Sequence, residues 1–289
     1  ASRAQKYIRL KRIKCNNARA QRDTRLQEGD VLQLYINDEF FDKPSEANAY
    51  LTVTAPKLNI VYEDENLILC NKPAGLQVHS DDKDDTNTLI TQIQAYLYKK
   101  GEYDPSSEQS FAPSLCNRID RNTSGIVIAA KNAAALRELN RLIKERRLTK
   151  KYLCAVHGSM EKKSDILTGC ITKDSDRNTV TVYRKRIPGS KDIKTGYRVL
   201  AEKNGLSLLE VELFTGRTHQ IRAHLSSVGH PLLGDGKYGS VTVNKRMGIF
   251  HQQLCAYSLE FKLNSGGILD YLNGKIFKVP DTGFSLNIF

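Results

Sequence analysis

Apolar positions recur with two different periods along the chain, and together they predict a mixed α/β fold. Short apolar runs rich in strand-forming residues predict strands near 60–62, 67–71, 125–131, 152–158, 179–184, 195–201, 206–214, 254–261 and 275–279. Helical spacing of apolar residues predicts a helix starting near Thr88, a second capped by Asn132 and a short third over 218–228. The pattern therefore indicates an α+β class in which strands and helices mix.

Turn signals divide a small N-terminal module from the main domain. Asn16 and Asn17 tolerate a positive φ and predict a turn after one strand, and a second strand is expected over 31–36. The stretch 37–56 is polar and contains two prolines. We therefore predict an N-terminal module over 1–42, a linker over 43–56 and a main domain over 57–289.

The charge of the chain favours a polyanionic partner. The 289 residues carry a formal charge of +12, and residues 1–36 alone hold nine Lys or Arg against three Asp or Glu. A basic module of this kind favours nucleic acid over a merely solvated surface. Six more cations lie between Arg141 and Lys151, more than capping a helix C-terminus requires, and they too are predicted to contact RNA or DNA.

Other classes of protein are disfavoured. No apolar run approaches the roughly 20 residues that span a bilayer, so no membrane association is expected. The six cysteines form no CxxC motif, and we interpret them as reduced and mostly buried in a cytoplasmic protein. We also expect no metal, because His219 and His224 lie on different faces of their predicted helix.

Three polar segments could carry chemistry. Asp120 has an arginine at −2 and at +1, which would favour its ionised form, although the loop could equally be held by ordinary turn bonds. Tyr152 follows two lysines and could lose its proton more easily, or could simply be a core tyrosine. His219 and Arg222 are three residues apart, so a helix would place them on one face.

These segments together resemble the RluA-type family of RNA pseudouridine synthases. The family motifs H-R-L-D-x-x-T-S-G, K-x-Y-x-A-x-V-x-G and G-R-T-H-Q-[IL]-R-x-H correspond in order to 117–125, 150–158 and 216–224. The segments 71–79 and 229–235 match two further family turns. Each motif is weak alone, but five in order are specific. Asn117 stands where the family usually has His, and Ile119 where it has Leu.

The resemblance implies a catalytic fold and a set of roles. The expected fold is a bent, largely antiparallel mixed sheet with flanking helices and a cleft across its middle. Asp120 would be the essential aspartate, Tyr152 the residue against the target base that takes its C5 proton, and Arg222 the partner of the aspartate. The residues expected to bind RNA are Arg118, which fills the gap left by the flipped uridine, and Lys150, Arg217 and His219. The family needs no cofactor and no metal.

The N-terminal module resembles the later part of an S4 RNA-binding domain, through the signature Asp23-Thr24-Arg25-Leu26 before Gly29-Asp30. The first S4 helices do not fit in so few residues, so we expect them to be missing. Such a module is typical of bacterial-type enzymes that modify large-subunit ribosomal RNA. The sequence thus predicts an isomerase that acts on 23S rRNA and that works as a monomer.

Three alternatives stay open at this stage. The substrate could be tRNA. The chain could be a catalytically silent RNA-binding protein that assists ribosome assembly. It could also be a glycoside hydrolase built around Asp120, although that chemistry needs a second carboxylate in a matched motif.

Overall fold

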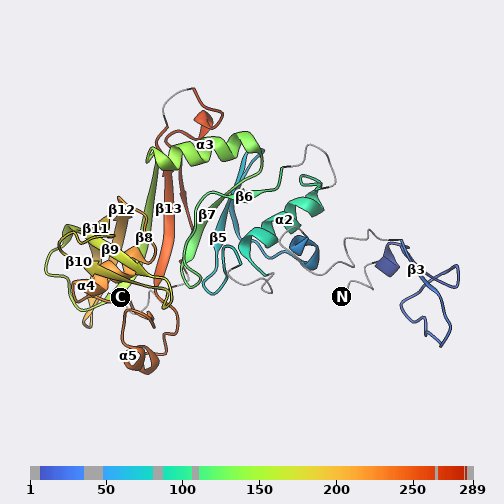
Figure 1. Ribbon diagram of the computed structural model, residues 1–289, viewed down its shortest axis with the longest axis horizontal. Coiled ribbons are helices and arrows are strands. Elements are labelled where there is room, and N and C mark those ends of the chain that lie inside the picture. The colour runs from blue at the N-terminus through green and yellow to red at the C-terminus, as the bar shows by residue number, and fades with distance from the viewer. Residues whose placement is uncertain are drawn as a thin grey trace.

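The chain forms one large mixed sheet with helices on its faces, together with a small N-terminal sheet (Figure 1). The computed structural model describes residues 7–35, 48–80, 87–105, 111–263, 266–282 and 284. The helices are η2 (Ala49–Thr52), α2 (Leu89–Lys100), α3 (Ala133–Lys144), α4 (Gln220–Ser227), α5 (Val241–Arg246) and η3 (Asp270–Leu272).

Eleven strands form the large sheet, nine of them on its main path. In spatial order these nine are β10 (Thr179–Tyr183), β9 (Ser164–Asp174), β11 (Lys191–Lys203), β12 (Leu206–Leu213), β8 (Leu148–His157), β13 (Leu254–Phe261), β7 (Ser124–Ala130), β5 (Leu67–Lys72) and β4 (Ile60–Glu63). Strand β14 (Ile276–Lys278) pairs with β13, and β6 (Ser114–Leu115) pairs with β7. Only the β13–β7 pair is parallel among the pairs of described strands, which confirms the predicted, largely antiparallel mixed sheet.

The parallel β13–β7 junction joins the two halves of the sheet, and Gly125 makes it possible. Gly125 has a φ of +112°, and a Cβ there would lie 2.3 Å from the carbonyl oxygen of Ala256 on β13. Only glycine allows this backbone approach without a clash. The loop that carries Asp120 enters β7 directly before this contact, so its position is fixed against both halves.

Both long helices begin where the sequence predicts. The side chain of Thr88 accepts a hydrogen bond from the Thr91 amide, and that of Asn132 accepts one from Ala135. Each thereby satisfies one of the amides that a helix N-terminus leaves unpaired. The buried face of α2 and the buried face of α3 then pack on opposite sides of β5 and β7.

The N-terminal sheet has the order β2-β1-β3, from Ala18–Arg19, Ile13–Cys15 and Leu32–Leu34. Asn16 and Asn17 have φ of 50° and 66°, which confirms the predicted turn. The side chain of Asn16 also donates to Asp30 and accepts from the Val31 amide, and these bonds tie the turn to β3.

Parts of the sequence interpretation are wrong. The predicted linker 43–56 contains η2, whose Tyr50 and Leu51 pack into the core beside α2, so this part belongs to the main body. Its polar neighbours and prolines hid these two anchors. Residues 36–47 lie outside the described residues, so the boundary at 42 stays a prediction. Strand β9 and helix α5 were not predicted at all, and no described helix is long and apolar enough to cross a membrane.

Candidate active site

The loop 117–123, which leads into β7, presents Asp120. Asn117 anchors its start, because the side-chain oxygen accepts a 2.8 Å hydrogen bond from the Ile128 amide of β7. The Thr123 amide donates to the Asp120 carbonyl, and Gln252 donates to the Thr123 hydroxyl. The amide of Asn117 thus positions the loop, as expected where the resemblance has a histidine.

Lys72 links the turn that follows β5 to the Asp120 loop. Its side chain is fully buried, and its Nζ donates to the carbonyls of Pro73, Leu76 and Arg121 at 2.7–2.9 Å. Burial lowers the pKa of Lys72 to about 7, and the charge of Asp120 opposes that shift. Three acceptors match the three N–H groups of an ammonium, so the contacts fit the charged form. The segment 71–79 therefore serves to support the Asp120 loop.

Arg222, in the first turn of α4, hydrogen-bonds two carboxylates. Its Nη1 donates to Oδ2 of Asp120 at 2.8 Å, while Nε and Nη2 bind both oxygens of Asp235 at 2.7 and 2.9 Å. Burial alone would lower the pKa of Arg222, but the hydrogen bonds and charges of Asp235 and Asp120 raise it. The fork with Asp235 fixes the guanidinium plane and so aims its third contact at Asp120.

Asp235 is the buried half of this arrangement. Burial would raise the pKa of Asp235, but its bonds to Arg222 and to the amides of Lys237 and Tyr238 hold that pKa below the usual range. Asn244 on α5 donates to the Asp235 carbonyl and accepts from the Gly234 amide. Because both Asp235 oxygens are occupied and buried, this carboxylate orients Arg222 and cannot reach a substrate.

His219 also lies close to the Asp120 carboxylate, in a backbone conformation that the sequence did not predict. The predicted helix over 218–228 begins only at Gln220, and His219 is its N-cap with a left-handed φ of 53°. Its Nδ1 lies 2.8 Å from the Tyr238 hydroxyl, and its Nε2 lies 3.9 Å from Oδ2 of Asp120. Burial lowers the pKa of His219, with Asp120 opposing the shift and Arg222 adding to it. His219 and Arg222 therefore meet at Asp120, but not through a shared helical face.

Tyr152 faces this site from β8 and is buried. Its ring packs in the cluster that contains Ile221 and is flanked by Ile119. Burial first, and then the negative charge of Asp120, raise the pKa of Tyr152. The expectation that neighbouring lysines ease its deprotonation is wrong, because they do not offset burial. Tyr152 is a neutral phenol near neutral pH.

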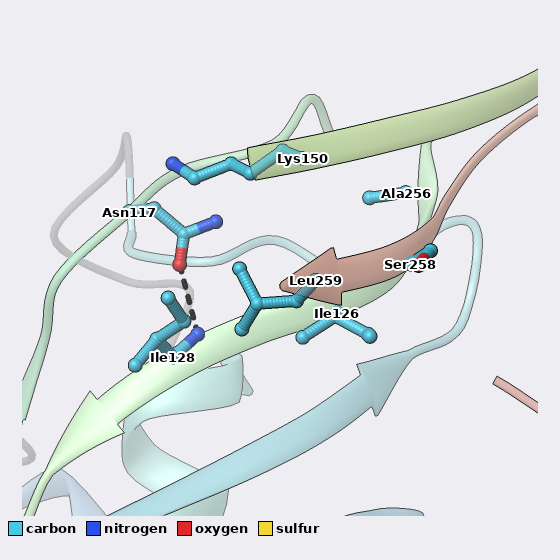
Figure 2. A pocket seen from close by; sticks show the side chains of 7 residues that line it. All are labelled: Asn117, Ile126, Ile128, Lys150, Ala256, Ser258 and Leu259. Carbon is cyan, nitrogen blue, oxygen red and sulfur yellow. Dashed lines mark hydrogen bonds between the residues drawn. The ribbon is translucent and has the colours of Figure 1, made fainter. Parts of the chain in front are cut away.

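The residues predicted to bind RNA fall into two groups. Arg118 is exposed in the Asp120 loop itself, and Arg217 is exposed just before α4. Lys150 instead lines a small pocket with Asn117, Ile128 and Leu259, as Figure 2 shows. Burial lowers the pKa of Lys150. This inward placement does not support the prediction that Lys150 contacts RNA.

The site holds the Asp120 carboxylate among cationic side chains. Asp120 is 27% exposed, and its Oδ1 accepts no hydrogen bond within the described residues. Oδ2 is thus held by Arg222, while Oδ1 accepts no hydrogen bond from a described residue. The described residues contain no group of three His, Cys, Asp or Glu side chains placed to hold a metal ion. Their six cysteines are free thiols, four of them buried.

Sequence reasoning missed two structural residues of the site. Asp235 lies in the 229–235 segment, but nothing in the spacing showed that it pairs with Arg222. Lys72 lies in the 71–79 segment, and a lysine beside a proline gave no sign of complete burial. A buried arginine needs a carboxylate partner, so a search for Asp in the remaining motifs could have found Asp235.

Comparison with known proteins identifies the class that this fold and site define. A family described as RNA pseudouridylate synthase matches residues 66–227. An RNA pseudouridine synthase of Mycoplasma genitalium is 35% identical over 260 residues, which cover 89% of this chain and 79% of the relative. The chain belongs to the RNA pseudouridine synthase family. It is an isomerase that converts uridine in RNA to pseudouridine.

Two further matches refine this picture. The ribosomal large subunit pseudouridine synthase D of Nitrosomonas europaea is 31% identical over 277 residues, covering 93% of this chain and 75% of the relative. A solved structure of human RNA pseudouridylate synthase domain containing 1 has a TM-score of 0.61 at 24% identity, and it covers 83% of this chain and 86% of that chain. The structural match shows that the fold is shared.

Proposed function

We propose that this synthase modifies uridines of 23S ribosomal RNA and that Asp120 is its catalytic residue. Similarity to the large-subunit synthase of Nitrosomonas europaea supports the substrate. The basic N-terminal module, with its S4-like signature, supports an RNA contact outside the main domain. The proposal describes a monomer that acts in the cytoplasm and requires no cofactor.

The observation that carries the catalytic assignment is the asymmetric environment of the Asp120 carboxylate. Arg222 holds Oδ2 at 2.8 Å, and Oδ1 accepts no hydrogen bond from a described residue. The guanidinium keeps the carboxylate oriented, as a nucleophile or a charge-stabilising group requires. Asp120 can therefore attack the uridine or assist cleavage of its glycosidic bond.

The reaction is an isomerisation, so its atoms balance within the substrate. The C1′–N1 bond breaks, the base rotates, and C1′ bonds to C5. The C5 proton then leaves and N1 gains a proton. A residue that accepts the C5 proton is needed, and Tyr152 as a neutral phenol is a weak acceptor. We infer that Tyr152 lies against the base and that Asp120 accepts the proton.

The target uridine must leave its helix to reach Asp120. Flipping a base costs a few kcal/mol of stacking and pairing. Arg118 is exposed in the same loop as Asp120, two residues away, and its planar guanidinium can fill the gap that the base leaves. Arg217 and His219 lie at the start of α4, where Nε2 of His219 is 3.9 Å from Oδ2 of Asp120.

The substrate is tested by mapping pseudouridines formed on unmodified transcripts. Purified protein is incubated with 23S rRNA and, separately, with bulk tRNA, and a pseudouridine-specific chemical readout locates the product. Product at discrete positions of 23S rRNA alone is expected. Product on tRNA alone would show that the substrate is tRNA and not 23S rRNA, while the reaction would stay the same. Binding to either RNA without product would favour a catalytically silent RNA-binding protein.

A further inference from the structure

Helix α5 and the segment after it form a basic, carboxylate-free part of the chain. Residues 236–259 contain no Asp or Glu but include Lys237, Lys245 and Arg246. Lys237 donates to the Asn178 carbonyl. Lys245 and Arg246 are exposed at the end of α5, and neither pairs with a carboxylate in the described part of the chain. Unpaired cations of this kind suit a phosphate backbone.

The same segment exposes an aromatic ring and several apolar side chains. Phe250 is 72% exposed, the largest exposure among the exposed large hydrophobic residues described, and its ring stacks on no other described aromatic ring. Val241, Val243 and Met247 are also exposed. These apolar side chains come from one short segment that also carries exposed cations, and an exposed apolar group bordered by charge is typical of a binding surface.

This surface is joined to the active site by close, buried contacts. Asn244 of α5 hydrogen-bonds the main chain of Gly234 and Asp235. A Cβ on Gly234 would lie 2.0 Å from the carbonyl oxygen of His251, the residue after Phe250. Asp235 in turn holds Arg222, which holds Asp120. Phe250 therefore stands on a rigid support that ends at the Asp120 carboxylate.

We propose that Phe250, Lys245 and Arg246 form a stacking platform for unpaired nucleotides that flank the target uridine. The ring accepts a base face, and the two cations contact the adjacent phosphates. Aromatic stacking with cationic support is how proteins hold single-stranded RNA without reading its sequence. The proposal rests on the RNA substrate stated above and adds the surface that receives its splayed-out strand.

The charge and shape of the platform favour RNA over other partners. A second protein copy would need a larger apolar area or matching carboxylates, and the segment carries only positive charge. An anionic membrane surface would attract the same cations. Both are therefore included as outcomes of the test.

The experiment measures the Kd for an unmodified 23S rRNA transcript with Phe250→Ala, Phe250→Leu and Phe250→Tyr. Loss of one stacked base should raise Kd about tenfold in the alanine and leucine variants, while tyrosine keeps the ring and the wild-type Kd. Ile276→Ala, which removes a similarly exposed apolar side chain from β14, is the control and should match the wild type. The double variant Lys245→Gln, Arg246→Gln should reduce the slope of log Kd against log salt by roughly 1.4.

Several results would overturn the platform. Equal Kd values for Phe250→Ala, Phe250→Leu and the wild type would remove the ring from the RNA interface. A wild-type dimer that dissociates in Phe250→Ala, measured by sedimentation, would assign the surface to a second copy. Phe250-dependent binding to phosphatidylserine vesicles with unchanged RNA affinity would assign it to a membrane. A wrong substrate proposal can be told apart from a wrong platform proposal, because in that case the wild type itself would not bind 23S rRNA. The Phe250 variants would then be measured on tRNA.

Discussion

At the scale of the residue, Arg222 links a buried carboxylate, Asp235, to the proposed catalytic carboxylate of Asp120. It is 7% exposed and satisfies both oxygens of a completely buried carboxylate while it orients an accessible one. A lysine could not reproduce three directed contacts in one plane. The arginine is therefore required even before substrate binds.

We predict that Arg222→Met costs about 3–5 kcal/mol of the free energy of unfolding, because it leaves the Asp235 charge buried without its partner. Urea denaturation measures this loss. The exposed Arg217 of the same motif supplies the control, since Arg217→Met should stay within about 0.5 kcal/mol of the wild type. A loss below about 1 kcal/mol for Arg222→Met would contradict the role given to the Asp235 pair.

Single residues also show what sequence can and cannot provide. The meeting of Arg222 and Asp120 was expected from the resemblance, and the structure brings them to 2.8 Å. The protonation of Tyr152 was not readable, because it depends on burial by residues far apart in sequence. The inward position of Lys150 was not readable for the same reason, since its surroundings come from β7 and β13.

At the scale of the element, Gly125 at the start of β7 holds the preceding Asp120 loop close to β13. We predict that Gly125→Ala destabilises the protein by several kcal/mol, because the new Cβ clashes with the β13 main chain at a φ that disfavours alanine. Thermal unfolding reports the change. Gly216→Ala is the matched control, since a Cβ there meets nothing within 4 Å. A Gly125→Ala protein as stable as the control would refute the tight junction.

Helix α4 gives the protein a pH dependence through His224. Burial lowers the pKa of His224 to about 4 from an ordinary value of 6.5, and its Nδ1 lies 3.0 Å from the Thr195 hydroxyl. Between these two pKa values the unfolded chain binds a proton that the folded protein excludes, so stability falls as pH falls. The loss from this residue between pH 7 and pH 5 should be about 2 kcal/mol.

Urea unfolding of the wild type and His224→Asn at both pH values isolates this contribution. The variant should lose about 2 kcal/mol less on acidification than the wild type. The exposed His251, changed to Asn, should keep the wild-type pH dependence. Parallel pH profiles for wild type and His224→Asn would show that His224 is not kept neutral.

The elements themselves were largely predictable where one period dominated. The caps Thr88 and Asn132 and most strand positions follow from local patterns. Strand β9 was missed because its first six residues alternate only between exposed and half-buried positions and include Asp, Thr and Gly, which weakens the apolar signal. Helix α5 has six residues and only one buried side chain, so its sequence carries no amphipathic period.

At the scale of the whole molecule, the N-terminal module is expected to add RNA affinity to the main domain. Replacing Arg9, Lys11, Arg12 and Lys14 together with glutamine should weaken binding to 23S rRNA and reduce the slope of log Kd against log salt by about 3. Lys162→Gln with Lys163→Gln is the control, because these lysines pair with Asp165 and Glu202. An unchanged slope in the fourfold variant would exclude the module from the interface.

The arrangement of the carboxylates also distinguishes a synthase from a glycoside hydrolase and from a catalytically silent RNA-binding protein. A glycoside hydrolase would need a second working carboxylate near Asp120, and Asp235 is buried with both oxygens bound. The family membership establishes the isomerisation, and the arrangement of Arg222 and Asp120 leaves an oxygen for chemistry that binding alone would not require.

The most direct test of this account compares pseudouridine formation by the wild type and Asp120→Asn on unmodified 23S rRNA without added cofactor. Asparagine keeps the size of the side chain and an oxygen that can accept from Arg222, so RNA affinity should stay close to that of the wild type. The account predicts pseudouridine with the wild type and none with Asp120→Asn at saturating RNA. Wild-type product levels from Asp120→Asn would contradict it.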